Sequence, residues 1–358
     1  MKKIAFIIPN FAVGGAEKIL LTIANALCSG YQVHIIFLKK EGLLLNELDA
    51  GITTWNVGNG RVYFSIFKIL KITKQIKPDI IFSWMGYLNA YLIFFKKFFP
   101  KNIHWYARES NIPSLINKMY RLTFLFEYFY RFNKNYDKIV CQTQFMANDL
   151  IQNYNVSPEL IYIIPNPYSL KGTGVNINPF KEQKRNILFT GRLRTEKRVE
   201  YLIEALALLP SNYHLNIVGD GDQKLKLMQR VKRLGVTNRV TFFGGQSQLE
   251  KYYRFADCLV LCSAFEGLPN VAIEAICNGC PVLAYNINTA LTSLDELITS
   301  DNGIIKSCTA FSAADMALLI EEGCMRPYDR HIIERDAKEK YSLETAIRKY
   351  KKIINSQE

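Results

Sequence analysis

The sequence has no apolar run as long as the roughly 18 residues that a membrane-spanning helix needs. It also lacks low-complexity tracts, short tandem repeats and the Gly-x-Gly-x-x-Gly pattern of dinucleotide-binding folds. Histidine is scarce: four stand among 358 residues, and none lies at a metal-ligand spacing from a cysteine. These absences argue against an integral membrane protein, a repeat protein and a Cys/His zinc protein.

The eight cysteines show no metal-binding pattern of their own. Cys258 and Cys262 lie in an apolar stretch that resembles a buried strand, and Cys277 and Cys280 flank a predicted helix end. We interpret them as reduced structural thiols, the state expected in a reducing compartment. The lysines before the apolar residues 4–8 superficially resemble a signal peptide, but proline and glycine end that run early. We therefore expect a cytoplasmic protein.

Acidic residues are fewer than basic residues, and the difference is largest in the first half of the chain. The formal net charge is +13, and residues 1–170 hold 19 basic and 10 acidic residues, a net of +9. A basic half indicates an anionic partner or surface. At 358 residues, with 49% hydrophobic residues, the chain is long enough for two buried cores and suggests two domains.

Both halves alternate continuous apolar strands with helical patterns, which is typical of parallel sheets covered on both faces. The predicted strands are 2–9, 32–38, 80–82, 103–107 and 138–142, then 186–190, 215–218, 240–243, 258–261 and 281–284. A stretch rich in Pro, Gly, Asn and Lys, 165–185, is the best linker candidate. We predict an α/β fold of two Rossmann-like domains facing a central cleft, with ligands at the carboxyl ends of the strands. The boundaries are 1–168, a linker at 169–185, 186–340, and a final helix at 341–358.

The most informative segment runs from residue 265 to 274. Glu266 and Glu274 stand eight positions apart there, around a Gly-x-Pro-Asn turn that should open a helix. The first N–H groups of that helix, near Asn270 and Val271, would form an anion site, with Glu274 about one turn further along. Amide donors for a phosphate and two carboxylates for hydroxyl groups are what a nucleotide sugar requires.

Loops with glycine follow the first strand of each half. Gly14 and Gly15 would let a ligand approach the backbone, and a plain strand-to-helix turn is an equal alternative. Arg192 and Lys197 follow the strand 186–190, where a guanidinium and an ammonium suit a diphosphate, although solvated basic turns are common. Gly219 opens a Gly-Asp-Gly-Asp turn that we interpret as lining a nucleotide pocket, with its first aspartate structural rather than a metal ligand.

In their order and spacing, these patterns resemble the retaining glycosyltransferases of family 4, over essentially the whole chain. The resemblance rests on Gly14-Gly15-Ala16-Glu17, Gly191-Arg192 through Lys197, Gly219-Asp220-Gly221, Glu266 through Glu274, Asn278-Gly279-Cys280-Pro281-Val282 and Asp301-Asn302-Gly303. It implies the GT-B fold, with an acceptor-binding first domain, a nucleotide-sugar-binding second domain, and a final helix that crosses back onto the first.

The resemblance also implies roles for individual residues. Arg192 and Lys197 would hold the donor diphosphate, Glu266 the C3 and C4 hydroxyls of the sugar, and Glu274 the ribose. The glycine pair and the amides near Asn270 would face the phosphates or the reacting sugar. No metal and no cofactor is expected, because neutralising the charge of a nucleoside diphosphate makes it a good leaving group. Retention by front-face attack is implied by the family alone.

One position departs from the family. Many relatives carry a histidine at the end of a first-domain strand that faces the donor sugar, and Glu109 appears at that place here, directly after Arg108. Glu109 orients or deprotonates the acceptor hydroxyl, or it simply pairs with Arg108; the sequence favours neither alternative. Nearby His104 falls inside the strand pattern and is expected to be a core residue.

Three helical stretches of the first half, 62–77, 91–99 and 119–132, combine aromatic residues with lysine and arginine. This composition suits an anionic lipid surface, and the alternative is that most aromatics are core and the lysines cover the outer face. We expect peripheral binding at the inner face of the cytoplasmic membrane and a lipid-diphosphate-linked oligosaccharide as acceptor. The resemblance here is to bacterial transferases for O-antigen, capsule and related glycans, and no nucleic-acid partner is expected.

The sequence therefore predicts a retaining, metal-independent glycosyltransferase. It would move a hexose or N-acetylhexosamine from a UDP-sugar to a hydroxyl of a surface glycan. Two alternatives remain: a nucleotide-sugar epimerase or glycogen-type enzyme of the same fold, and a non-catalytic nucleotide- or carbohydrate-binding subunit of a polysaccharide-synthesis complex. The paired glutamates fit the first alternative, whereas the intact set of basic and acidic residues argues against the second.

Overall fold

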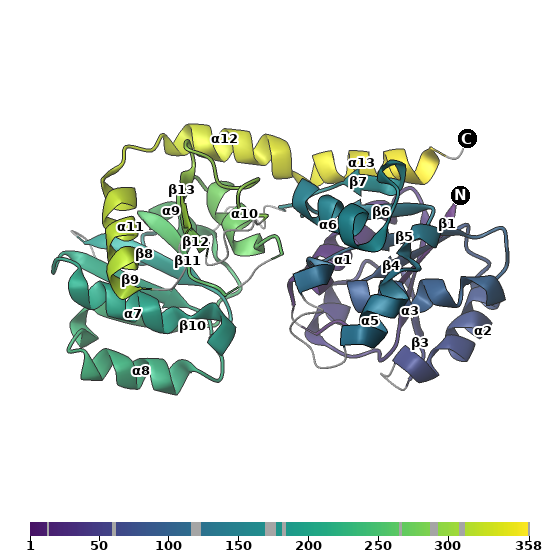
Figure 1. Cartoon of the computed structure of the whole chain (residues 1–358), viewed down its shortest axis with the longest axis horizontal. Coiled ribbons are helices and arrows are strands. Elements are labelled where there is room, and N and C mark those ends of the chain that lie inside the picture. The colour runs from purple at the N-terminus through teal and green to yellow at the C-terminus, as the bar shows by residue number, and fades with distance from the viewer. Residues whose placement is uncertain are drawn as a thin grey trace. The chain divides into compact units, whose positions relative to one another are not determined.

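The computed structural model describes residues 1–12, 14–58, 62–115, 123–168, 177–180, 184–264, 267–286, 293–307 and 312–356. The chain forms two compact units, each with its own parallel sheet (Figure 1). Unit 1 comprises Met1–Pro167 together with Leu343–Glu358, and unit 2 comprises Tyr168–Ser342. The final helix thus belongs to the same unit as the amino-terminal strands.

Unit 1 is built on a seven-stranded sheet in which every described pairing is parallel. The strand order β3-β2-β1-β4-β5-β6-β7 reverses between β1 and β4, which is the topological switch point of a doubly wound sheet. The strands are β1 (Lys3–Ile8), β2 (Gln32–Phe37), β3 (Thr53–Asn56), β4 (Ile80–Trp84), β5 (His104–Arg108), β6 (Lys138–Cys141) and β7 (Ile161–Ile163).

Helices cover both faces of this sheet. Helices α1 (Gly15–Leu27) and α13 (Leu343–Asn355) pack on one face, where Tyr350 and Ile354 join the core around β1 and β2. The other face carries α2 (Ile66–Ile76), α3 (Gly86–Phe94), α5 (Thr123–Tyr130) and α6 (Gln144–Tyr154). Short 3-10 turns complete the unit: Leu43–Glu47, Val62–Phe64, Lys96–Phe98, Asn133–Asn135 and Pro158–Leu160.

Helix α2 illustrates how sequence period gives packing. Ile66, Ile69, Ile72 and Ile76 recur every three or four positions and are buried against the sheet, and the intervening lysines are exposed. The Nζ of Lys68 also donates to the carbonyl oxygen of Val57 at 2.9 Å. The helix ends at Lys77, which adopts the left-handed conformation with φ of 51°. The lysines of α2 are therefore a surface feature, as an amphipathic pattern predicts.

Unit 2 repeats the architecture with six parallel strands in the order β10-β9-β8-β11-β12-β13. The order reverses between β8 and β11, so the loops that follow these two strands lie side by side. The strands are β8 (Arg185–Thr190), β9 (Tyr213–Val218), β10 (Val240–Gly244), β11 (Cys258–Leu261), β12 (Val282–Asn286) and β13 (Gly303–Ser307).

The helices of unit 2 form two layers. Helices α7 (Val199–Leu208), α8 (Lys224–Arg233) and α11 (Ala313–Met325) share one buried cluster with the sheet. Helices α9 (Glu250–Phe255), α10 (Asn270–Ile276) and α12 (Arg330–Tyr341) share the other. Two 3-10 turns, Thr195–Lys197 and Thr237–Arg239, lie in the connecting loops. The fold class predicted from the sequence, two Rossmann-like parallel-sheet domains, is confirmed.

Some local predictions were wrong. The strands β3, β7 and β13 were not predicted, and His104 is exposed at the first position of β5 rather than buried in the core. The exposure of His104 follows from the strand pairing, because β5 begins one residue after the predicted start and His104 is its first residue. No helix of the residues that the structure describes is long and apolar enough to cross a membrane.

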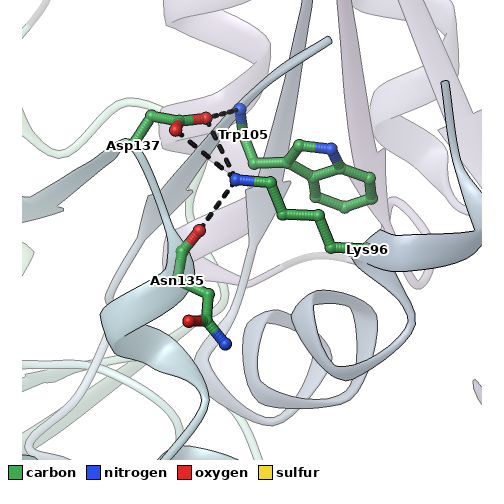
Figure 2. Close-up of polar contacts among 4 residues, drawn as sticks. All are labelled: Lys96, Trp105, Asn135 and Asp137. Atoms are coloured by element: carbon green, nitrogen blue, oxygen red, sulfur yellow. Dashed lines mark hydrogen bonds and ion pairs between the residues drawn. The ribbon is translucent and has the colours of Figure 1, made fainter. Parts of the chain in front are cut away.

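Lys96 shows how a basic residue of unit 1 can be structural (Figure 2). Its Nζ donates to the carbonyl oxygen of Asn135 at 2.8 Å and lies 3.4 Å from both carboxylate oxygens of Asp137. The same carboxylate accepts the backbone N–H of Trp105 at 2.6 Å. Lys96 thus ties the segment after α3 to the sheet, whereas its neighbour Lys97 is exposed.

Candidate active site

The basic loop of unit 2 begins at the carboxyl end of β8, beside the switch point. Gly191 donates its N–H to the carbonyl of Val218 at 3.0 Å, and Leu193 is fully buried. The side chain of Arg192, between these two anchors, is exposed. The backbone is therefore pinned on both sides of an arginine that points to solvent, which suits binding of an anion.

Two glycines lock the neighbouring loop against this one. A methyl group at Gly219 would lie 1.8 Å from the carbonyl oxygen of Gly191, and one at Gly221 would lie 2.3 Å from the carbonyl oxygen of Leu193. Gly219 also has φ of 149°, which side-chain-bearing residues rarely adopt. The glycine at 219 is thus required by loop-to-loop packing.

An open pocket of about 610 Å³ lies over these loops. It is lined by Arg192, Arg194, Thr195, Glu196, Asp220, Gly221 and Asp222. Asp220 accepts the N–H of Gly221 at 3.0 Å and pairs with Lys224 at 3.0 Å; these bonds to a cation and an amide hold the pKa of Asp220 below its usual value. Its carboxylate is thus engaged by its own loop, and Lys197, Gly219 and Glu274 are not among the residues that line this pocket.

Backbone hydrogen bonds join the basic loop to the loop after β11. Ala264 donates its N–H to the carbonyl of Glu196 at 2.8 Å, and the thiol of Cys262 donates to the carbonyl of Lys197 at 3.0 Å. Phe265 and Glu266, the next residues along the chain, lie outside the described residues. The structure therefore brings the backbone of the basic loop next to the segment that leads into α10.

Helix α10 begins at Asn270, with Pro269 in the capping position. Glu274, one turn along, is half-buried, and its Oε2 accepts a hydrogen bond from the hydroxyl of Tyr253 at 2.8 Å. That hydroxyl also lies 3.1 Å from Oγ1 of Thr190, the last residue of β8. Tyr253 and Thr190 were not singled out from the sequence, because neither belongs to a pattern with a known spacing.

The glycine pair of unit 1 opens α1. Gly14 caps the helix with an extended backbone, and Gly15 is its first residue. The carboxylate of Glu17 folds back over this end, since a methyl group at Gly14 would lie 2.2 Å from its Oε2. A carboxylate at a helix amino terminus interacts favourably with the helix dipole. Whether Gly14 and Gly15 contact a ligand stays a prediction.

Glu109 lies directly after β5 and has only 1% of its surface exposed. Asn89 donates to its Oε1 at 2.9 Å. A methyl group at Gly86 would lie 2.6 Å from its Oε2 and 2.0 Å from the Tyr130 hydroxyl, so the carboxyl group and this phenol meet around Gly86. Burial raises the pKa of Glu109 to about 7, against the lowering effect of the Asn89 hydrogen bond and the Arg108 charge.

Arg108 is occupied elsewhere. Its Nε donates to the Tyr350 hydroxyl at 3.1 Å, another of its nitrogens donates to Asn166, and its guanidinium lies 4.7 Å from the centre of the Trp84 ring. Among the described residues, Arg108 forms no ion pair with Glu109. The simple pairing of these two residues, one of the two alternatives from the sequence, is therefore wrong.

The cysteines of the described part of the chain are free thiols, and most are buried. Burial raises the pKa of Cys277 and of Cys280 to about 12, so both are protonated at neutral pH. No group of three or more His, Cys, Asp or Glu residues that could hold a metal ion occurs within the described ranges.

Two family models match the chain. The model described as Glycosyltransferase Family 4 matches residues 13–171, and the model described as Glycosyl transferases group 1 matches residues 174–339. Together they cover both units.

Curated relatives agree with this assignment. An α-1,4-N-acetyl-D-galactosaminyltransferase of Campylobacter jejuni, named for a glycan linked to undecaprenol diphosphate, is 28% identical over 77% of this chain and 77% of its own. An uncharacterised glycosyltransferase of Methanocaldococcus jannaschii is also 28% identical, over 86% of this chain and 77% of its own.

Among solved structures, the complex of Anabaena HepE with UDP has a TM-score of 0.81 at 18% identity, covering 99% of this chain and 100% of that one. WaaG, a glycosyltransferase of lipopolysaccharide biosynthesis, has a TM-score of 0.73 at 20% identity, covering 98% and 99%. At these identities the likeness concerns the fold. The two matched models and the two-sheet architecture together show that the chain belongs to the family 4 glycosyltransferases with the GT-B fold.

Proposed function

We propose that this glycosyltransferase moves a hexose or N-acetylhexosamine, with retention, from a UDP-sugar to a hydroxyl of a glycan linked to a lipid diphosphate. The observation that carries the proposal is the junction in unit 2. There the loop that bears Arg192 and Lys197 is hydrogen-bonded to the segment that leads into α10 and Glu274. Cationic, amide and carboxylate groups thus come from adjoining loops of one sheet edge.

Each part of the donor has a proposed partner. Arg192 and Lys197 neutralise the diphosphate as it leaves, with the amides of Asn270 and Val271 at the start of α10 in support. Glu266 holds the C3 and C4 hydroxyls of the sugar, and Glu274 holds the ribose. Because protein cations neutralise the leaving group, the reaction needs no divalent ion in this scheme. The departing phosphate helps to accept the proton of the attacking hydroxyl.

The nature of the substrates is supported by the relatives. HepE has been crystallised with UDP and with UDP-glucose, and the Campylobacter jejuni relative acts on an undecaprenol-diphosphate-linked glycan. Both share the architecture or the sequence of this chain over most of its length. We infer the same class of donor and of acceptor here.

We propose a supporting role for Glu109. Its carboxyl group is buried and engaged by Asn89, so in this conformation it does not present a base to a hydroxyl from solvent. It holds the end of β5 in place through Asn89, whose Nδ2 also donates to the carbonyl of Arg108 at 3.0 Å. Met85, directly after the neighbouring strand β4, has a φ of 98°, which residues other than glycine rarely adopt.

The acceptor's lipid would bring unit 1 to an anionic membrane. Helix α2 contains no acidic residue, and its solvent face carries Lys68, Lys71 and Lys74. Phe67 is 81% exposed on the same helix, and Phe64 just before it is 67% exposed. Exposed aromatic rings beside lysines suit the headgroup region of a bilayer. We propose peripheral binding through this face at the inner side of the cytoplasmic membrane.

Donor and product analysis tests the function. The purified enzyme is incubated with a panel of nucleotide sugars and a lipid-diphosphate oligosaccharide, and the anomeric configuration of the product is read by NMR. We expect transfer from a UDP-sugar with an α product from an α donor. An inverted product would contradict retention. UDP binding without transfer to any acceptor would favour a non-catalytic subunit, and isomerisation of the sugar would favour an epimerase.

Vesicle sedimentation tests the membrane face. Replacing Lys68, Lys71 and Lys74 together by glutamine should weaken binding to phosphatidylglycerol vesicles by roughly a hundredfold, given about 1 kcal/mol per lysine. The matched control replaces Lys226, Lys232 and Arg233, which are exposed on α8 of unit 2, and makes the same change in net charge. An equal loss in both variants would mean that net charge alone, rather than the face of α2, drives binding.

A further inference from the structure

The hydroxyl of Tyr253 connects helix α10 to the end of strand β8 by hydrogen bonds. It donates to Oε2 of Glu274 at 2.8 Å and lies 3.1 Å from the hydroxyl of Thr190. A phenol has one proton, so if it donates to the carboxylate it must accept from threonine. The hydrogen bonds then run in one direction, from Thr190 to Tyr253 to Glu274.

This link is sheltered from water. Tyr253 is 1% exposed and Thr190 is 4% exposed, whereas Glu274 is half-buried at the end of the chain of bonds. Burial, and next the charge of Glu274, raise the pKa of Tyr253 well above its ordinary value. The phenol therefore stays protonated at neutral pH and remains a hydrogen-bond donor there.

The backbone of Tyr253 is itself held in place. The guanidinium of Arg330, the first residue of α12, donates to the carbonyl oxygen of Tyr253 at 2.9 Å and to that of Ala256 at 2.6 Å. A cation on the last carbonyls of a helix interacts favourably with its dipole, and here it fixes the end of α9. The side chain of Tyr253 is thus buried, and both its backbone carbonyl and its hydroxyl are hydrogen-bonded, which restricts the positions that the hydroxyl can take.

We propose that Tyr253 is a positioning residue that orients the Glu274 carboxylate toward the ribose hydroxyls of the donor nucleotide. This rests on the proposed function, in which Glu274 holds the ribose. A carboxylate on a helix can rotate about its side-chain torsions, and a hydrogen bond from a rigid, buried phenol selects one orientation. The bond to Thr190 couples that orientation to the end of β8, where the loop of Arg192 begins.

The first test removes the hydroxyl alone. Tyr253→Phe should weaken UDP binding by about tenfold, the value of one hydrogen bond to a charged group, and should leave kcat within about twofold of the parent. Tyr252→Phe is the matched control, because it makes the same change at the neighbouring position of α9, where the ring packs on Phe243. It should leave UDP affinity within about twofold.

Readouts other than affinity separate positioning from general loosening. The parent should prefer UDP over its 3′-deoxyribose analogue, and Tyr253→Phe should reduce this preference. In a double-mutant cycle, Tyr253→Phe should cost nothing further when Glu274 is already alanine, which has no oxygen to accept the bond from the phenol. Thr190→Val, which removes the donor to the phenol, should have a smaller effect in the same direction, and it keeps the test available if the phenylalanine variant unfolds.

The outcomes are distinct. If Glu274→Ala reduces UDP affinity but Tyr253→Phe and Thr190→Val do not, the positioning role is overturned while the ribose contact stands. If Glu274→Ala leaves both UDP affinity and the 3′-deoxy preference unchanged, the proposed ribose contact itself fails, and the positioning role with it. Additive losses in the double-mutant cycle would likewise overturn the proposal.

Discussion

The carboxyl edges of the two sheets use charge in opposite ways. In unit 2 the edge beside β8 is open: Arg192 is exposed beside a pocket of about 610 Å³, and the glycines of the next loop hold its backbone. In unit 1 the residue after β5 is Glu109, buried and satisfied by Asn89. The same architecture thus leaves a charged side chain exposed in one unit and encloses one in the other, which supports the proposal that the diphosphate binds in unit 2.

The largest effect should come from Glu266, the residue proposed to contact the sugar. Glu266→Ala should lower kcat by roughly 10²–10³-fold, the range for losing one well-placed polar contact in a transition state, while UDP affinity changes little. Steady-state kinetics and UDP calorimetry measure the two quantities. Asp315→Ala, an exposed carboxylate of α11 outside the pocket lining, is the control and should change kcat less than about threefold. Full transfer activity in the Glu266 variant would remove that residue from the sugar site.

The next largest effect should come from disturbing the packing between the Gly219 loop and the Gly191 loop. Gly219→Ala should destabilise the protein by about 2–4 kcal/mol, because the new methyl group meets the Gly191 carbonyl and the backbone has positive φ. Urea unfolding measures the change. Gly245→Ala, with open space around the new methyl group, should have almost no effect. Equal stabilities of the two variants would mean that the loops are not locked as described.

The buried carboxyl group of Glu109 predicts that the stability of the folded protein depends on pH. The pKa of Glu109 is raised to about 7 in the folded state, so the stabilisation from its proton is present below about pH 4.5 and is lost as the pH rises through 7. Glu109→Gln mimics the protonated form, and should therefore stabilise the protein more at pH 8 than at pH 5, by up to roughly 3 kcal/mol.

Thermal or urea unfolding at the two pH values checks this dependence. Glu127→Gln, at an exposed position of α5, provides the control and should show no such difference. The same stability change at pH 5 and pH 8 for Glu109→Gln would show that the carboxyl group titrates normally, and the contrast between the two edges would weaken.

The smallest effect is expected on metal removal. If Arg192 and Lys197 neutralise the leaving diphosphate, transfer should fall by less than about twofold in excess EDTA. Activity assays with and without added magnesium check this. Loss of transfer on chelation, restored by magnesium, would show that the open edge recruits a cation that the scheme does not include.

The difference between the two sheet edges also shows which features could be predicted from the sequence. Continuous apolar strands and glycine-containing loops predicted both sheets and the basic loop, because each has a strong local signal. The strands β3 and β7 are short and only partly buried at the sheet edges, so their pattern is weak. The burial of Glu109 depends on Gly86, Asn89 and Tyr130 from other elements, and no local pattern encodes such an arrangement.

The residues that hold the Glu274 carboxylate in place also lack a local sequence signal. Tyr253 reaches it from another helix, and the loop after β11 reaches the basic loop through backbone atoms whose partners do not depend on side-chain identity. The residues proposed to contact the substrate have sequence signals, whereas most of those that hold them in place do not.

The central claim is that Arg192 and Lys197 bind the diphosphate of the donor. Calorimetry with UDP and with uridine, on Arg192→Ala, Lys197→Ala and the control Lys226→Ala, an exposed lysine of α8 outside the pocket lining, tests it most directly. We expect each of the first two variants to weaken UDP binding by about tenfold or more while uridine binding is unchanged, and Lys226→Ala to stay within about threefold for both ligands. UDP affinities equal to that of the parent in both Arg192→Ala and Lys197→Ala would contradict the account.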